Sequence, residues 1–301
     1  MRDKVLPGAS REALGFIAAH WKSLAKMSVI PFLAYLIVAV IQIKGLGTFY
    51  RSMGSAVESN GINPDFTGAY MRNMAFSMLG SLLAMCLMGL LFAQIIRFHK
   101  TGLAEWIMTD KAGIVAGLMT LVYGIGIAML TMLVYIGSVF AFALLMAIFG
   151  AMMGGTVIIA FLGIVGVVSL VAGLYWFMFR FLVGLPGVAL GSSPDFFKDM
   201  WPLSKGESWG LPLRMLLATL VAYVPMFLVL MIFSWSAIAD MVSKLPQQGS
   251  AENPAVMFPI MAELMDRMLP ATVAMTVVYV PFMWFMALLL AIAFQRFRAR
   301  G

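Results

Sequence analysis

Four methionines come nearest to a metal site in this sequence. They lie at intervals of four, four and three residues, at Met257, Met261, Met265 and Met268. From Met261 onward this spacing places them on one face of a helix. Thioether sulfur is a soft ligand that suits Cu(I). The alternative is an amphipathic helix that rests its methionine face on a membrane or on a neighbouring helix. Because the chain holds 28 Met in all, the second interpretation is favoured, and neither a metal nor another cofactor is predicted.

The other reactive side chains give no support to catalysis. The two histidines, His20 and His99, lie in different segments, and neither belongs to a metal-binding motif. Ser77 and Ser81 lie in an apolar segment without a nearby His or Lys, whereas a serine nucleophile needs such a base. Cys86 is the single cysteine, so it forms no internal disulfide. The sequence therefore predicts that the protein is not an enzyme.

The composition is that of a membrane protein. Of the 301 residues, 62% are hydrophobic and 11% are charged, and the mean hydropathy is +0.98. A soluble domain carries about 25% charged residues. The stretch 112–190 contains a single charged side chain, Arg180. Because about 20 apolar residues let a helix cross the hydrocarbon core, this stretch is expected to cross it more than once.

We therefore predict an all-α fold, a polytopic membrane helical bundle with six transmembrane helices in a single domain over residues 1–301. Residues 1–26 are expected to form an amphipathic segment, 27–294 the six-span bundle and 295–301 a basic tail. Glycines within 150–155 should separate the third span from the fourth, although four crossings of 112–190 are the alternative to two. The polar segments 48–72 and 240–269 are expected to be loops, the second with a short helix over 259–268. The spans are predicted near residues 27–47, 73–96, 112–146, 156–183, 211–237 and 270–294.

Short amphipathic helices are expected at the membrane interface, and one of them should begin with Ser193 as its N-cap. For residues 10–26, packing against the protein's own surface is an equal alternative to lying in the interface. Four tryptophans are predicted interfacial anchors, namely Trp21, Trp106, Trp201 and Trp209. Seven basic side chains are predicted to contact lipid phosphates, namely Lys22, Lys26, Arg97, Lys100, Arg180, Lys198 and Lys205. For Arg180, snorkelling to the head groups or capping a helix is the favoured alternative.

The distribution of basic residues predicts the orientation. Six spans place both termini on one side of the membrane. Excess Lys and Arg marks the cytoplasmic side, so both termini are predicted to be cytoplasmic. Of the 20 Lys and Arg residues, the opposite loops hold only Lys44, Arg51, Arg72, Lys244 and Arg267.

Two segments near the end of the fourth span resemble a known group of proteins. The matching residues are Arg180, Pro186, Leu203, Lys205, Gly206 and Trp209, the last four within the run Trp201–Trp209. Their pattern resembles that of the YciC-like and glycerophosphodiester phosphodiesterase membrane-domain group of bacterial inner-membrane proteins. Asp195 and Lys198 stand where small or basic residues are more usual. The resemblance implies a multi-pass protein of the bacterial inner (cytoplasmic) membrane with a role in envelope maintenance. It implies no catalytic residue, because the phosphodiesterase chemistry of the group belongs to a separate soluble domain.

The expected function is therefore non-enzymatic. We expect a protein that binds membrane lipids or partner membrane proteins, including copies of itself, for example as an accessory subunit of a membrane complex. No nucleic-acid partner is expected, since the basic residues flank apolar spans. The alternative is a carrier or channel for a small or lipidic amphiphilic solute. An ion-coupled carrier is disfavoured because no acidic residue lies deep in a predicted span.

Overall fold

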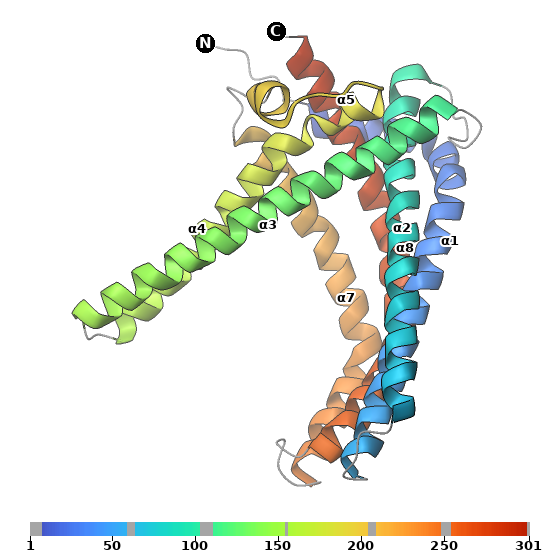
Figure 1. The fold of residues 1–301 in the computed structure, drawn as a ribbon. Coiled ribbons are helices and arrows are strands. Elements are labelled where there is room, and N and C mark those ends of the chain that lie inside the picture. The colour runs from blue at the N-terminus through green and yellow to red at the C-terminus, as the bar shows by residue number, and fades with distance from the viewer. Residues whose placement is uncertain are drawn as a thin grey trace. The chain divides into compact units, whose positions relative to one another are not determined.

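The computed structural model describes residues 8–58, 64–102, 111–153, 156–203, 209–247 and 254–299, and every regular element within these ranges is helical (Figure 1). The elements follow one another as α1 (Ala9–Glu58), α2 (Pro64–Thr101), α3 (Lys111–Met153), α4 (Thr156–Leu182), α5 (Leu185–Ala189), the π-helix η2 (Phe196–Met200), α6 (Trp201–Leu203), α7 (Gly210–Gln247) and α8 (Pro254–Arg298). The all-α prediction is confirmed for these residues.

Within the described residues, six helical stretches are long and apolar enough to cross a membrane. Two of them, Lys111–Val139 and Ser169–Ala189, lie in the long apolar region around Arg180. The helix break falls where the glycines predicted it, because α3 ends at Met153 and α4 begins at Thr156. The two helices lie side by side as a hairpin (Figure 1). The chain is therefore a multi-pass membrane protein, and the described residues of this region form two candidate spans rather than four.

The predicted loops 48–72 and 240–269 are wrong over most of their length, because helices extend into them. α1 continues to Glu58, and α2 already begins at Pro64. α7 continues to Gln247, and α8 starts at Pro254 and runs without a break through the expected short helix into the last span. Pro64 is the first residue of α2, and Pro254 is the first residue of α8. Proline suits the first helical position, where its missing N–H costs no hydrogen bond.

The helix α1 is longer than the membrane is thick. α1 has 50 residues, which at about 1.5 Å per residue gives about 75 Å, whereas the hydrocarbon core is about 30 Å thick. α1 leaves helical geometry at His20, where φ is −122° and ψ is 15°. The helix begins at Ala9. His20 thus separates a short N-terminal helical segment from the part that holds the first span.

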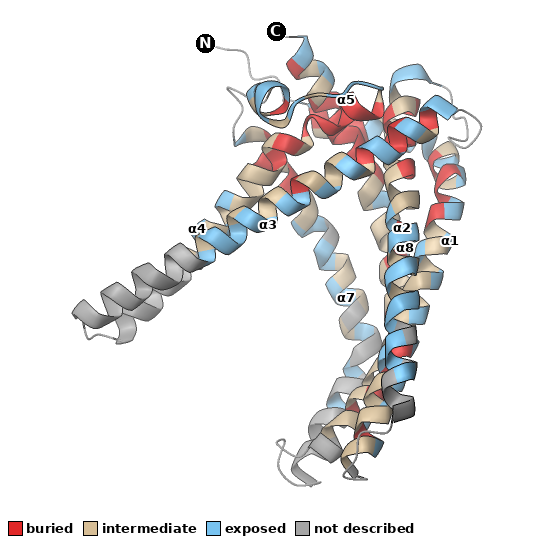
Figure 2. Ribbon diagram, in the orientation of Figure 1, coloured by how far each residue is buried: buried red, intermediate tan, exposed pale blue. Residues whose placement is uncertain are grey.

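The described helices fall into two compact units, and α1, α2, α7 and α8 contribute to both. Unit 1 comprises Met1–Trp21, Phe92–Ala218 and Phe285–Gly301, and unit 2 comprises Lys22–Leu91 and Thr219–Trp284. The core of unit 1 lies around α5, whose residues are all buried (Figure 2). Its central cluster combines one residue of α3, one of α4, two of α5 and one of η2, namely Ile127, Phe181, Leu185, Val188 and Met200.

Unit 2 is held together by polar contacts as well as apolar ones. The amide Nε2 of Gln42 donates to Ser81 Oγ over 2.5 Å and joins α1 to α2. Arg51 of α1 forms an ion pair with Asp266 of α8. Close helix approach accompanies that pair, because a Cβ built on Gly47 would lie 3.2 Å from Asp266 Oδ1. These tertiary contacts stabilise the helical ends that the sequence pattern assigned to loops.

Candidate functional site

Near the end of α4, the lone charge of the long apolar stretch lies against two indole rings. Trp176 and Arg180 are four residues apart on α4, so they lie on one face of the helix. The guanidinium carbon of Arg180 is 5.1 Å from the centroid of the Trp176 ring and 4.3 Å from that of the Trp201 ring. Its Nη2 also donates to the backbone oxygen of Trp201 at 3.3 Å. A cation over an indole face gains about 0.5–1 kcal/mol when exposed and about 2 kcal/mol when desolvated.

The two indoles rest on a buried aromatic base. The Trp176 and Trp201 rings meet edge to face at 5.6 Å, and Trp201 lies 5.2 Å from the Phe181 ring. Phe181 is fully buried and also contacts Phe196 at 6.0 Å. The base therefore ties the aromatic side chains around Arg180 to the core of unit 1. We refer to Trp176, Arg180 and Trp201 as the arginine–tryptophan cluster.

An acidic cap positions the helix that carries Trp201. Asp195 precedes the helix in extended geometry, and its Oδ1 accepts hydrogen bonds from the N–H groups of Phe197 and Lys198, each at 2.9 Å. Its own N–H donates to Asp199 Oδ2 at 2.7 Å. The predicted N-cap Ser193 is therefore wrong. Asp195 stands directly before the first helical residue, and a carboxylate accepts stronger hydrogen bonds than a hydroxyl.

Hydrogen bonding at this cap also favours the ionised form of the Asp195 carboxyl. The backbone N–H groups of Lys198 and Phe197, in that order of effect, lower the pKa of the Asp195 carboxyl below its usual value. The charged form of Asp195 is thus the form that stabilises the start of η2 and α6.

The structure brings only some of the predicted site residues together. Arg180 and Trp201 meet in the cluster, and the exposed Trp209 joins its edge, with its ring 6.2 Å from that of Trp176. Trp176 was not predicted as an anchor, although a Trp four residues before the lone Arg was a usable signal. The remaining predicted residues are placed as follows: Arg97 is half-buried and Lys100 is exposed on α2, Lys198 is exposed on η2, Trp21, Lys22 and Lys26 are exposed on α1, and Trp106 and Lys205 lie outside the described residues.

Both histidines meet on one phenylalanine, which the sequence analysis missed. The Phe16 ring is 4.5 Å from the His20 ring and 5.0 Å from the His99 ring. Beside them, Glu12 at the start of α1 forms a 2.5 Å ion pair with Arg296 near the end of α8. Within the part of the chain that the structure describes, no group of three or more His, Cys, Asp or Glu side chains is arranged to hold a metal ion.

The methionines of α8 lie half-buried. The Cβ of Met265 is 3.7 Å from the position that a Cβ on Gly47 of α1 would occupy. This contact places Met265 against a neighbouring helix, as the second interpretation of the methionine pattern expects.

Comparison with known proteins assigns no family to this geometry. No family model, no curated protein and no solved structure matches the chain. Its function is therefore inferred from the chemistry of its own side chains.

Proposed function

We propose that this chain is a non-enzymatic integral membrane protein that binds anionic lipid head groups at the membrane boundary, and that it also contacts partner membrane proteins or copies of itself. The arginine–tryptophan cluster carries the proposal. It joins a cation in the last turn of α4 to two indole rings. Tryptophan and snorkelling arginine are the side chains that favour the head-group region.

The geometry of the cluster is compatible with phosphate contact. A cation–π contact uses the face of the indole ring, whereas a phosphate takes hydrogen bonds from the N–H groups of the guanidinium. The two interactions therefore do not compete for the same atoms. Holding the guanidinium against Trp176 and Trp201 lowers the entropy that Arg180 would lose when it binds an anion.

Exposed apolar surface supports contact with acyl chains or with a partner protein. Within the described residues α7 exposes large apolar side chains at helical spacing, including Leu213, Leu217, Leu220 and Val224. In a membrane, acyl chains or another apolar helix must cover such a surface. The proposed partners are therefore membrane lipids and membrane proteins, and no nucleic acid.

The proposed location is the bacterial inner membrane, with both termini in the cytoplasm. The ion pair between Glu12 and Arg296 brings the start of α1 beside the end of α8, as an even number of crossings requires. The excess of basic residues on the side of the termini supports the cytoplasmic orientation. The resemblance of the Arg180–Trp209 region to the YciC-like group supports a role in envelope maintenance or as an accessory subunit.

Mass spectrometry of the protein purified from native membranes in a mild detergent tests the proposal. We expect the wild type to retain anionic phospholipid and Arg180→Gln to retain less, because the variant removes the cation but keeps a polar side chain. Arg298→Gln is the control, since it removes an exposed cation outside the cluster. A wild type that retains neither lipid nor partner protein would overturn the function. Equal retention by wild type and Arg180→Gln would overturn the role of the cluster.

A further inference from the structure

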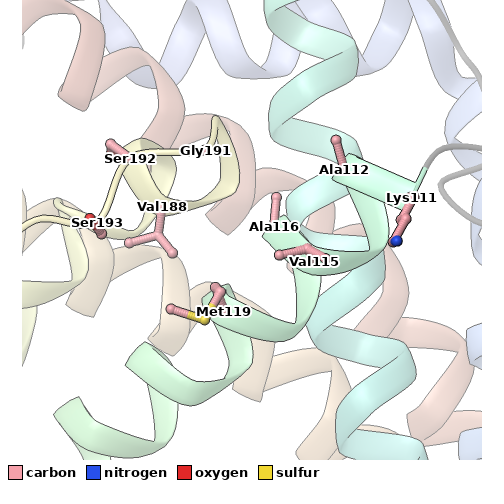
Figure 3. A pocket seen from close by; sticks show the side chains of 9 residues that line it. All are labelled: Lys111, Ala112, Val115, Ala116, Met119, Val188, Gly191, Ser192 and Ser193. Atoms are coloured by element: carbon pink, nitrogen blue, oxygen red, sulfur yellow. The ribbon is translucent and has the colours of Figure 1, made fainter.

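A pocket of about 660 Å³ opens in unit 1 between the start of α3 and the turn that follows α5 (Figure 3). Pockets that hold small ligands measure about 300–1,000 Å³, so its volume suits a ligand or part of one. Its lining residues do not include Trp176, Arg180 or Trp201. The pocket is therefore separate from the arginine–tryptophan cluster.

The pocket is apolar on its floor and polar at its edges. Val115, Ala116 and Met119 of α3 form the floor together with Val188 of α5. Lys111, the first residue of α3, stands at one edge.

Ser192 and Ser193 line the opposite edge (Figure 3). Among the described residues, no acidic side chain lines the pocket, and the start of a helix as long as α3 adds the positive end of its dipole. The charge of the pocket thus suits an anion, and its floor suits hydrocarbon.

The ends of two membrane spans place this pocket at the membrane boundary. One span begins at Lys111 and the other ends at Ala189, just before the serines. The polar edges therefore stand where lipid phosphates lie, and the apolar floor continues into the hydrocarbon region. A free anion would leave that floor uncovered, whereas a lipid would cover it with an acyl chain.

Backbone geometry holds the serine edge in place. Gly191 has a φ of +93°, which favours glycine, and it turns the chain into Ser192. The N–H of Ser192 donates to the carbonyl of Gly187 at 3.0 Å. A Cβ on Gly187 would lie 2.8 Å from Ser192 Oγ and 3.0 Å from the Phe294 ring. The turn is packed against α5 and α8, so the edge is formed before any ligand arrives.

We propose that this pocket binds one anionic phospholipid, with the phosphate at the Lys111 ammonium and with an acyl chain along Val115 and Met119, between α3 and the serine turn. The ammonium donates charge-assisted hydrogen bonds to the phosphate, and the serine turn bounds the pocket on the side opposite Lys111. This inference rests on the proposed lipid-binding function and names the lipid class and the residues that select it.

The test is a titration of the delipidated full chain in mild detergent with phosphatidylglycerol, read by native mass spectrometry. We expect one tightly bound lipid. Lys111→Gln should weaken its binding about tenfold, as the loss of one charge-assisted hydrogen bond predicts. Lys111→Arg should keep the wild-type affinity, because it keeps the positive charge. Met119→Trp should block the floor, whereas Met119→Leu should not. Lys44→Gln, an exposed lysine in unit 2, is the matched control. Thermal unfolding confirms that each variant is folded.

The possible failures are distinguishable. If wild type binds the lipid and the Lys111→Gln and Met119→Trp variants bind it equally well, the pocket is not the site, and the proposed function stands. If inorganic phosphate displaces the lipid at equal concentration, the ligand is a free anion and the lipid assignment fails. Equal affinity for phosphatidylcholine would overturn the selection for an anionic lipid. If wild type binds no lipid and no partner, the proposed function fails as well.

Discussion

Trp284 donates its indole N–H to the hydroxyl oxygen of Ser28 across 2.7 Å, although 256 residues separate them in the chain. Ser28 in turn donates to the carbonyl of Leu24 at 2.8 Å. Both residues are buried, with 8% of Trp284 and 2% of Ser28 exposed. This two-step hydrogen-bond chain joins the first membrane helix to the last.

Trp284→Phe removes the indole donor and keeps most of the ring. Hydrogen bonds between membrane helices contribute about 0.6 kcal/mol on average, so we expect a loss of about 0.5–1.5 kcal/mol. Thermal unfolding in detergent should show a small decrease in Tm. Ser28→Ala completes a double-mutant cycle, and the two losses should not add, because both variants remove the same bond. Strict additivity would show that the bond contributes nothing.

Arg180→Met keeps an unbranched side chain but removes the cation that contacts Trp176 and Trp201. Two cation–π contacts and one hydrogen bond are lost, so we expect destabilisation of about 2 kcal/mol. The fluorescence of these tryptophans should shift as their surroundings change. Arg180→Lys keeps the charge without the planar guanidinium and should lie between the wild type and Arg180→Met. A Met variant with wild-type Tm and fluorescence would refute the coupling.

The cap at Asp195 should make the start of η2 and α6 sensitive to acid. The pKa of Asp195 is lowered in the folded protein by the backbone N–H groups of Lys198 and Phe197. Because the pKa is lowered on folding, the cap stabilises the helix start fully at a pH above the pKa of Asp195 in the unfolded chain, about 3.9. This stabilisation is lost as the pH falls through the lower pKa that Asp195 has in the folded protein. The protection of the Phe197 and Lys198 amides from hydrogen exchange, measured relative to the intrinsic exchange rate at each pH, should therefore decrease below about pH 4.

Asp195→Asn separates capping from titration. Asparagine caps helices about as well as aspartate but does not ionise, so the variant should keep slow exchange at neutral pH and lose the acid transition at this site. An unchanged acid transition in Asp195→Asn would assign it to another group.

Gly184→Ala should destabilise unit 1 through crowding. A Cβ at this position would lie 2.9 Å from both Sδ and Cε of Met200 and closer still to its Cγ. Because Met200 is 1% exposed, its side chain has little room to move, and we expect a loss of about 1–3 kcal/mol. Adding Met200→Ala to Gly184→Ala should recover part of this lost stability, because it removes the side chain that the new Cβ meets.

Gly124→Ala is the matched control for this crowding. No atom lies within 4 Å of the position that its Cβ would take, so the substitution should be neutral or slightly stabilising, as alanine favours a helix. Equal melting temperatures of Gly184→Ala and Gly124→Ala would contradict the crowding at Gly184.

Helix ends and caps depended on contacts that a local pattern does not contain. The polar residues 48–58 read as a loop, yet in the structure they extend α1, because Arg51 pairs with Asp266 and Gly54 packs on Pro259 of α8. The helix cap is Asp195 and not the predicted Ser193, because the turn after α5 places Asp195 directly before η2. Both differences arise because distant segments supply partners that local propensity cannot anticipate.

The sequence by itself determined that this is an all-helical membrane protein with six candidate spans, because the length and apolar character of a crossing segment are local properties. It also singled out Arg180, Trp201 and Trp209 as boundary residues. Only the tertiary structure placed Trp176 and Trp201 around Arg180, brought His20 and His99 to Phe16, and joined Lys111 to the serine turn in one pocket. These juxtapositions join residues far apart in the chain, and the packing of the helices and the turn at Gly191 decides which of them meet.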